Sequence, residues 1–336
     1  MYSQPVHVLV TGAGSAPALA FVRGLRAQSE LDVRLIGVDG VPDSFGLFEC
    51  DYRYTVPPVK DVAFLDAIRA ICRAHHVEVI VPTLDFELDL FAGAASVLWA
   101  ELGVRVISNT PATVALARDK RRSAAVAASA GVAVPRTYAQ EEIATAPLPL
   151  VIKPTIGAGS IGVTVVRTTA DLERAVAAAG PQPLAQELVV GPEYTVDLVV
   201  APDGAILAAA PRHRVEVRGG QSYKGRTVDD EEVEDSARRC ALAHRMTGQG
   251  NVQLIKAHGG RTTFIELNPK FAAALGLTVA AGLNIPLLYV KLALGLPIAP
   301  NELTRRSDVW MLRAWQERFI DASDVDAVPP WTDARC

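Results

Sequence analysis

The chain has 336 residues, of which half are hydrophobic and only 6% aromatic, and its formal net charge is −4. This length allows two or three packed domains. A weakly acidic chain has no positive field for gripping a nucleic-acid backbone, so we expect no nucleic-acid partner. The cysteines lie far apart without metal-ligand spacing, which indicates reduced thiols in a cytoplasmic protein. They are Cys50, Cys72, Cys240 and Cys336.

Strand and helix patterns alternate over the first 110 residues. Strand patterns fall at residues 6–10, 33–38, 77–81 and 104–107. Helix patterns fall at residues 17–28, 61–75 and 84–102. This alternation is typical of a parallel sheet covered on both faces, so residues 1–110 are expected to form a Rossmann-like α/β domain. A helix over 111–130 should follow, with Asn109 or Thr110 as its N-cap.

After Gly131 the pattern changes to short β-rich runs in pairs, which indicates an α+β arrangement. Residues 150–153 should pair with 162–166, and 184–188 with 194–200 and 205–211, with a helix over 170–179 between them. Pro202-Asp203-Gly204 predicts a hairpin turn. A helix over 229–247 and strands over 251–257 and 262–267 follow, the strands joined by a Gly259-Gly260 turn. We expect a small subdomain over 111–200, a C-terminal subdomain over 201–325 and a mobile tail over 326–336.

Residues 271–290 contain no charged side chain. Glycine, asparagine and proline interrupt this stretch, which favours a buried helix with flanking loops over a membrane span. We therefore expect a soluble protein with no membrane partner.

Residues 151–162 place a lysine, Lys153, at the end of an apolar run and directly before a glycine-rich loop. Glycines let backbone N–H groups approach phosphate oxygens closely, and the lysine adds positive charge at the same place. The pattern predicts a phosphate site, although a flexible turn beside a surface lysine has the same sequence.

Three oxygen-bearing side chains are expected to converge further along the chain. Glu266 and Asn268 are two positions apart and point to the same face of a strand. The Gly259-Gly260 turn returns this strand beside Gln253. Such oxygens suit Mg²⁺, and because only one of them is charged the metal should arrive with a nucleotide. The polar face of an edge hairpin is the alternative.

Residues 211–226 hold four arginines, a lysine and a histidine. Arg212 and Arg214 should share one face of a strand, and guanidinium groups bind carboxylates and phosphates in two-point fashion. Arg218 and Lys224 could equally be solvated surface charges, and His213 receives no role.

The N-terminal Gly12-Ala13-Gly14 turn, with Asp39 ending the next strand, resembles a dinucleotide-binding turn. Proline replaces the third glycine of that pattern, which makes the signal weak. Asp85 and Glu87 in the same domain either line a substrate cleft or favour the N-terminus of a helix.

Taken together, these motifs resemble the ATP-grasp ligases, in the branch similar to the domains of the large subunit of carbamoyl-phosphate synthetase. The resemblance spans residues 6–320, and several of its motifs occur in the order that the family uses. In chain order its five segments are Arg118–Lys120, the Lys153 loop, Gln186–Tyr194, residues 211–226, and the Gln253 and Ile265–Lys270 strands. The expected architecture is an ATP-grasp fold with an N-terminal Rossmann-like domain.

The resemblance implies a role for each of these segments. Lys120 and Lys153 would hold the nucleotide phosphates, although a charged helix face would also explain Lys120. The loop that covers the phosphates would comprise Gly157, Gly159, Ser160 and Gly162. Backbone atoms from Gln186 through Glu187 to Val189 would bind adenine and Glu193 the ribose, although a solvated loop glutamate is the alternative for Glu193.

The resemblance also implies the metal ligands and the catalytic residues. Gln253, Glu266 and Asn268 would hold Mg²⁺, with Mn²⁺ as an alternative, and Arg212 and Arg214 would stabilise the transferred group. The family most often has arginine and a glycine-rich run after its Asn-Pro, whereas this chain has Lys270 and alanines at 272–274. Lysine keeps the charge but loses the planar fork.

The expected activity is ATP-dependent joining of a carboxylate to an amine through an acylphosphate, and a homodimer is compatible with the sequence. Two rival hypotheses stay open. A non-catalytic nucleotide sensor would explain Lys270 and the alanine run, and a dehydrogenase would explain the N-terminal turn.

Overall fold

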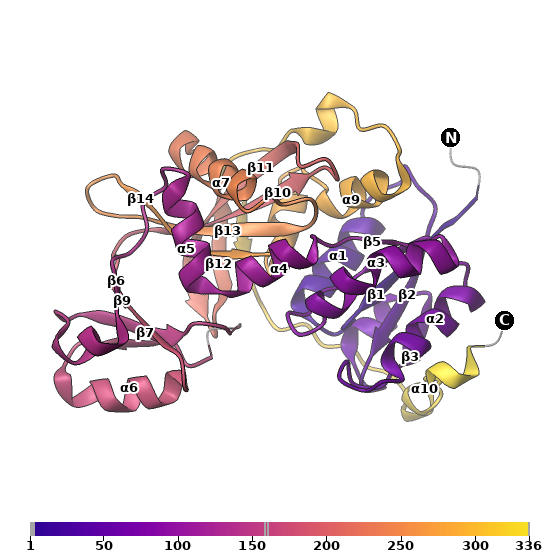
Figure 1. Cartoon of the computed structure of the whole chain (residues 1–336). Helices are drawn as coiled ribbons and strands as arrows, with labels where there is room; N and C mark the ends of the chain where they lie inside the picture. Colours follow the sequence, from indigo (N-terminus) through magenta and orange to yellow (C-terminus); the bar gives the residue numbers. More distant parts are fainter. Residues whose placement is uncertain (1–3, 158, 160, 335–336) are drawn as a thin grey trace.

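The computed structural model describes residues 4–157, 159 and 161–334, which form three sheets (Figure 1). The N-terminal sheet is parallel, with the order β3-β2-β1-β4-β5. Its strands are β1 (Val6–Thr11), β2 (Val33–Asp39), β3 (Tyr52–Thr55), β4 (Val79–Val81) and β5 (Arg105–Val106). Its helices are α1 (Ala16–Arg26), α2 (Phe64–Ala74) and α3 (Leu88–Leu102).

Strand β1 shows why this sheet is covered on both faces. Its side chains alternate between two cores: Val8 and Val10 pack with Phe21 of α1, and Leu9 packs with residues of α2 and α3. A strand buried on both sides needs a continuous apolar run, which the sequence provides. The predicted Rossmann-like arrangement is confirmed.

The helix predicted over 111–130 is two helices, α4 (Pro111–Arg118) and α5 (Lys120–Ser129), with Thr110 as the N-cap of the first. Asp119 separates them in an extended conformation, and its carboxylate accepts the N–H groups of Arg121 and Arg122 at 3.1 and 3.0 Å. An aspartate that caps a new helix ends the previous one. The break lets the Lys120 N–H donate to the carbonyl oxygen of Thr155 at 3.0 Å, beside the glycine-rich loop.

The small sheet has the order β6-β9-β7-β8 and, with helix α6 (Leu172–Ala179), forms a lobe of its own in Figure 1. Its strands are β6 (Thr137–Tyr138), β7 (Leu150–Pro154), β8 (Thr164–Val166) and β9 (Pro183–Glu187). The predicted β7–β8 hairpin is confirmed. Strand β9 pairs with β7 and β6, not with the strand that follows it as the sequence pattern suggested.

The third sheet has six strands in the order β14-β13-β10-β11-β12-β15. They are β10 (Glu193–Val200), β11 (Ile206–Arg218), β12 (Gln221–Thr227), β13 (Gly250–Lys256), β14 (Thr262–Asn268) and β15 (Trp310–Leu312). Because β10 is an inner strand here, the small lobe ends near Glu187 and not at residue 200. Helices α4 and α5, also assigned to the small lobe, pack instead against β14, beside α7 (Glu231–Ala243).

The charge-free stretch forms two short helices, α8 (Leu275–Ala280) and α9 (Ile285–Leu294). They contact α1, and Phe271 before them packs on Phe21 with 5.1 Å between ring centroids. The N-terminal and six-stranded sheets therefore share one hydrophobic core. Across the described ranges, none of the helices combines the length and apolarity that crossing a membrane would need.

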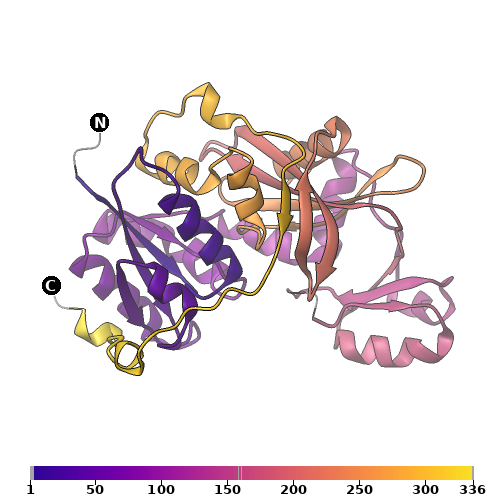
Figure 2. The ribbon, with the colours of Figure 1, turned by 180° about the vertical axis from the view of Figure 1, so that it is seen from behind.

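The expected mobile tail is docked on the N-terminal sheet up to residue 334. Figure 2 shows the chain after β15 crossing from the six-stranded sheet to this sheet, where α10 (Ala322–Asp326) lies. Val328 is buried with Ala13 and Phe48, and the Thr55 N–H donates to the carbonyl oxygen of Pro329 at 3.0 Å. The buried Val328 holds the tail on the domain, although the many prolines and aspartates of this segment suggest a mobile one.

Candidate active site

A cavity of about 660 Å³ lies where the three sheets meet. It collects most of the residues singled out from the sequence. They are Lys120, Lys153, Gly157, Gly159, Gln186, Glu187, Val189, Glu193, Arg212, Arg214, Gln253, Glu266, Asn268 and Lys270. Gly162 is not among the lining residues, because it packs against the lobe: a Cβ there would lie 2.8 Å from the carbonyl oxygen of Ala178. Ser160 lies outside the described residues.

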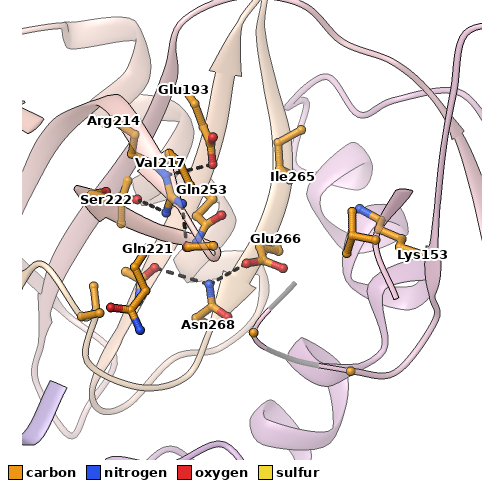
Figure 3. Close-up of a pocket in the computed structure, with 18 of the residues that line it drawn as sticks. Lys153, Glu193, Arg214, Val217, Gln221, Ser222, Gln253, Ile265, Glu266 and Asn268 are labelled. Carbon is orange, nitrogen blue, oxygen red and sulfur yellow. Dashed lines mark hydrogen bonds and ion pairs between the residues drawn. The ribbon is translucent and has the colours of Figure 1, made fainter. Parts of the chain in front are cut away.

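The expected oxygen cluster forms on the antiparallel pair β13–β14. Gln253 lies opposite Glu266, and Asn251 opposite Asn268, so these four side chains share one face of the sheet. Figure 3 shows Gln253, Glu266 and Asn268 side by side. Asn251 was missed, although its position two residues before Gln253 puts it on the same face.

Hydrogen bonding fixes which atoms this cluster presents. The Nδ2 atom of Asn268 donates to Glu266 Oε1 at 3.0 Å. Since a carboxylate only accepts hydrogen bonds, the amide nitrogen must face Glu266, and the carbonyl oxygen of Asn268 is left for another partner. Carboxylate and amide oxygens are ligands that Mg²⁺ takes in proteins, usually together with nucleotide phosphates. The residues present therefore fit a magnesium–nucleotide complex.

Two lysines face this cluster from the other side of the cavity. Lys153, on β7, is only 6% exposed, and burial lowers the pKa of its ammonium group to about 8. The positive charge of Lys120 lowers this pKa further, and Glu266 opposes the shift. Figure 3 shows Glu266 between Lys153 and Arg214. A buried cation that has lost hydration gains strongly from an anionic ligand.

Lys120 is held beside the glycine-rich loop. Its Nζ donates to the carbonyl oxygen of Gly157 at 2.7 Å, and burial lowers the pKa of its ammonium group. The helix break at Asp119 creates this position, because a continuous helix would not bring the Lys120 backbone against Thr155. The two lysines and the loop together form a positive wall.

Arg214 joins β11 to the expected ribose site. Its Nε lies 3.0 Å from Glu193 Oε1, and one terminal nitrogen donates to the carbonyl oxygen of Gly220 at 2.9 Å. Burial raises the pKa of Glu193, Arg214 lowers it, and the nearby charge of Glu266 raises it. Nε is buried but makes no hydrogen bond, so the pair is an ion pair of imperfect geometry, open to rearrangement by a ligand.

Arg212 also lines the cavity but is fully buried. Its Nε and a terminal nitrogen donate to Asp197 at 2.7 and 2.8 Å, and the Thr278 hydroxyl donates to the same carboxylate at 2.5 Å. This two-point pair leaves the other terminal nitrogen for a ligand. Arg212 and Arg214 therefore share a face as expected, and Arg212 is the more rigidly held of the two.

Lys270 pairs with Asp85, which follows β4 in the N-terminal domain, so this ion pair bridges two sheets at the cavity wall. Glu87 does not reach the cavity. It is 2% exposed and accepts hydrogen bonds from the Thr11 hydroxyl and the Thr83 and Leu84 N–H groups, and burial raises its pKa to about 6. Of the two N-terminal acids, Asp85 therefore faces the site, and Glu87 links β1 to the segment that follows β4.

The N-terminal turn is packed closely against Asp39 and Ser44. The carboxylate of Asp39 accepts the Gly14 N–H at 2.9 Å and the Ser44 hydroxyl at 2.8 Å. A Cβ on Gly14 would lie 2.0 Å from Ser44 Oγ, so the space beside this glycine is filled by the protein itself. The glycine serves close packing here.

Comparisons with known proteins agree with this geometry. The family model described as "ATP-grasp in the biosynthetic pathway with Ter operon" matches residues 180–315, and that of the "PylC-like, N-terminal domain" matches residues 8–107. No curated protein matches the chain significantly. The resemblance to the ATP-grasp superfamily is confirmed by the family model over residues 180–315.

Solved structures share the fold at low sequence identity. Biotin carboxylase from Campylobacter jejuni, in complex with an ATP analogue, has a TM-score of 0.71 and 18% identity, over 90% of this chain and 74% of that one. L-amino acid ligase from Bacillus licheniformis has a TM-score of 0.68 and 15% identity, over 90% and 78%. N5-carboxyaminoimidazole synthetase from Staphylococcus aureus has a TM-score of 0.67 and 11% identity, over 88% and 78%.

Proposed function

We propose that the protein is an ATP-dependent ligase that joins a carboxylate to an amine through an acylphosphate, with release of ADP and phosphate. The observation that carries the proposal is the buried Lys153 facing the oxygen cluster of Glu266 and Asn268 across one cavity. A positive wall opposite oxygen ligands is what a metal-bound triphosphate requires.

The proposed reaction has two steps. A carboxylate oxygen of the first substrate attacks the γ-phosphorus of ATP, and the bond from this phosphorus to the β–γ bridging oxygen breaks, which gives ADP and an acylphosphate. The nitrogen of the amine then attacks the acyl carbon. The carbon–nitrogen bond forms, the carbon–oxygen bond to phosphate breaks, and the amine proton passes to the departing phosphate or to solvent.

The residues of this chain position the reactants and neutralise charge, as is general in phosphoryl transfer. Lys120 and Lys153 would hold phosphates, the segment Gln186–Val189 adenine, and Glu193 the ribose, and the loop at 157–162 would exclude water. Gln253, Glu266 and Asn268 would hold Mg²⁺, which supplies charge neutralisation of the phosphates when bound. Arg212 and Arg214 would face the transferred group, and Lys270 the substrate.

The cysteines support a reducing, cytoplasmic setting for this activity. Cys50, Cys72 and Cys240 are buried free thiols, and burial raises the pKa of each to about 12. Thiols of this kind are unreactive core residues.

ADP release in the presence of Mg²⁺, screened over pairs of amino acids and other carboxylic acids, tests the proposal. We expect turnover with at least one pair, loss of turnover in Glu266→Gln, and wild-type rates in the control Glu173→Gln, an exposed residue of α6. Equal turnover in the wild type and Glu266→Gln would refute the assigned site.

A second candidate is a non-catalytic nucleotide sensor. The Lys270–Asp85 pair favours it, because the lysine at the position of the usual substrate-side arginine is neutralised by an acid of another domain. Tight ATP binding without ADP release across the whole panel would support the sensor.

A further inference from the structure

Strand β12 begins with a glutamine, Gln221, directly after the Gly219-Gly220 turn; this residue lines the cavity and has no role in the nucleotide site. Figure 3 shows Gln221 among the lining residues, on the side of Asn268 away from Lys153. This end of the cavity also contains Ser222 and the alanine run 272–274. Gln221 and Ser222 lie about fifty residues before the alanine run in sequence, and the fold brings the two segments together at one wall of the cavity.

Arg313, directly after β15, determines how Gln221 is oriented. One terminal nitrogen of Arg313 donates to Gln221 Oε1 at 3.2 Å, and the other donates to the carbonyl oxygen of Ala273. A guanidinium group has donors only, so the amide atom that faces it must be the oxygen. The amide nitrogen of Gln221 is then the group left for the cavity, and a ligand there meets a hydrogen-bond donor.

The electrostatics of this wall favour a negatively charged ligand atom. Within the described ranges, no acidic group lies within ion-pair distance of Arg313, whose two acceptors are neutral. Burial lowers the pKa of Arg313, and the nearby charge of Arg212 lowers it further. The charge of Arg212 is compensated by Asp197. The positive charge of Arg313 therefore lies next to Gln221 and Ala273. It polarises the amide of Gln221, so that the N–H groups of this amide become better hydrogen-bond donors to an anion.

The backbone holds Arg313 in place. Strand β15 pairs with β12, and the pairing continues through Arg313, whose N–H donates to the carbonyl oxygen of Tyr223 at 3.2 Å. The same strand β12 begins at Gln221, so donor and acceptor are carried by neighbouring strands. The fork of the guanidinium links this strand pair to the loop of Ala273.

We infer that Gln221 is a substrate-binding residue, which donates a hydrogen bond to a carboxylate oxygen of the substrate that binds beside the nucleotide. Arg313 is the positioning residue that orients the amide of Gln221. The inference rests on the proposed function for the identity of the site as that of a ligase. It assigns carboxylate recognition to the start of β12 and the residue after β15, in addition to the arginines of β11.

A binding experiment tests this without requiring turnover. The full chain, saturated with MgADP, is titrated by calorimetry with the twenty L-amino acids and their carboxamides. We expect a bound acid that the wild type prefers to its carboxamide, and we expect Gln221→Leu to weaken that acid by about tenfold, the range for a hydrogen bond to a charged group. The affinity for MgADP should not change, which also verifies that the variant is folded.

Arg313→Met distinguishes a positioning role from a merely structural one. Without the guanidinium the amide of Gln221 can turn over, so Arg313→Met should weaken the same acid to a similar extent, and the double variant should be no weaker than either single variant. Arg313→Lys should restore part of the affinity, because lysine keeps the positive charge but lacks the planar fork that holds both acceptors in a fixed geometry. The control Gln316→Leu, an exposed glutamine three residues further along, should bind as the wild type does.

Three results would overturn the inference: wild-type affinity in Gln221→Leu, additive losses in the double variant, or failure of every carboxylate to bind the wild type. Failure of the proposed function looks different, because a carboxylate would then bind and depend on Gln221 while no ADP is released with any pair of substrates.

Discussion

Replacing Lys153 by arginine keeps a positive charge in the cavity but removes a group that titrates near pH 8. In the free protein, burial lowers the pKa of Lys153 to about 8, so the ammonium group loses its proton at moderately alkaline pH. Bound phosphates favour the charged form and raise this pKa again. Above pH 8, nucleotide binding must therefore take up a proton, and the affinity of the wild type should fall by about tenfold per pH unit.

Arginine stays protonated throughout this range. Lys153→Arg should therefore lose about one proton of uptake per nucleotide bound, even if its affinity at pH 7 is reduced by the change of shape. Calorimetric titration with a non-hydrolysable ATP analogue between pH 7 and 9.5, in buffers of different ionisation enthalpy, measures both quantities. Lys60→Arg, an exposed lysine outside the cavity, is the matched control and should keep the wild-type pH dependence. The reasoning fails if wild type and Lys153→Arg show the same proton uptake.

Three further predictions concern stability. The pKa of Lys153 in the folded protein lies below that of an unfolded lysine, so the free protein should gain stability as pH rises from 8 toward 10. Lys153→Met should abolish this gain. Urea unfolding at several pH values measures the free energy of unfolding of both proteins. Asp197→Asn leaves the Arg212 charge buried without its partner and should lower the free energy of unfolding by about 3–5 kcal/mol, and a smaller loss in the double variant with Arg212→Met would distinguish charge from packing. Val328→Ala should cost about 1–2 kcal/mol by removing buried methyl groups beside Ala13, and proteolysis near residue 320 should become faster; unchanged protease resistance would contradict the docked tail.

The sequence predicted the layered N-terminal sheet and the oxygen cluster because both depend on local periodicity. A continuous apolar run such as that of β1 requires a sheet that is covered on both faces. Residues two positions apart on a strand lie on the same face. The placement of Glu266 beside Gln253 followed from one turn. Predictions of this kind need no knowledge of distant contacts.

Other features depend on contacts between distant segments and could not be predicted in this way. The break at Asp119 looks like the middle of a helix in sequence, and the contact with the loop around Thr155 and Gly157 that it allows Lys120 to make is visible only in the fold. The pairing of Lys270 with Asp85 joins residues 185 positions apart. The edge strand β15, with Arg313 after it, is too short to give a periodic signal, so its position beside β12 is visible only in the fold.

The central claim is that the oxygen cluster and the lysine wall receive a magnesium-bound nucleotide. The most direct measurement is the affinity of the wild type and Glu266→Gln for an ATP analogue, determined by calorimetry with Mg²⁺ and with a chelator in its place. We expect Mg²⁺ to tighten binding to the wild type and to have little effect on Glu266→Gln. An equal effect of Mg²⁺ on both proteins would contradict it.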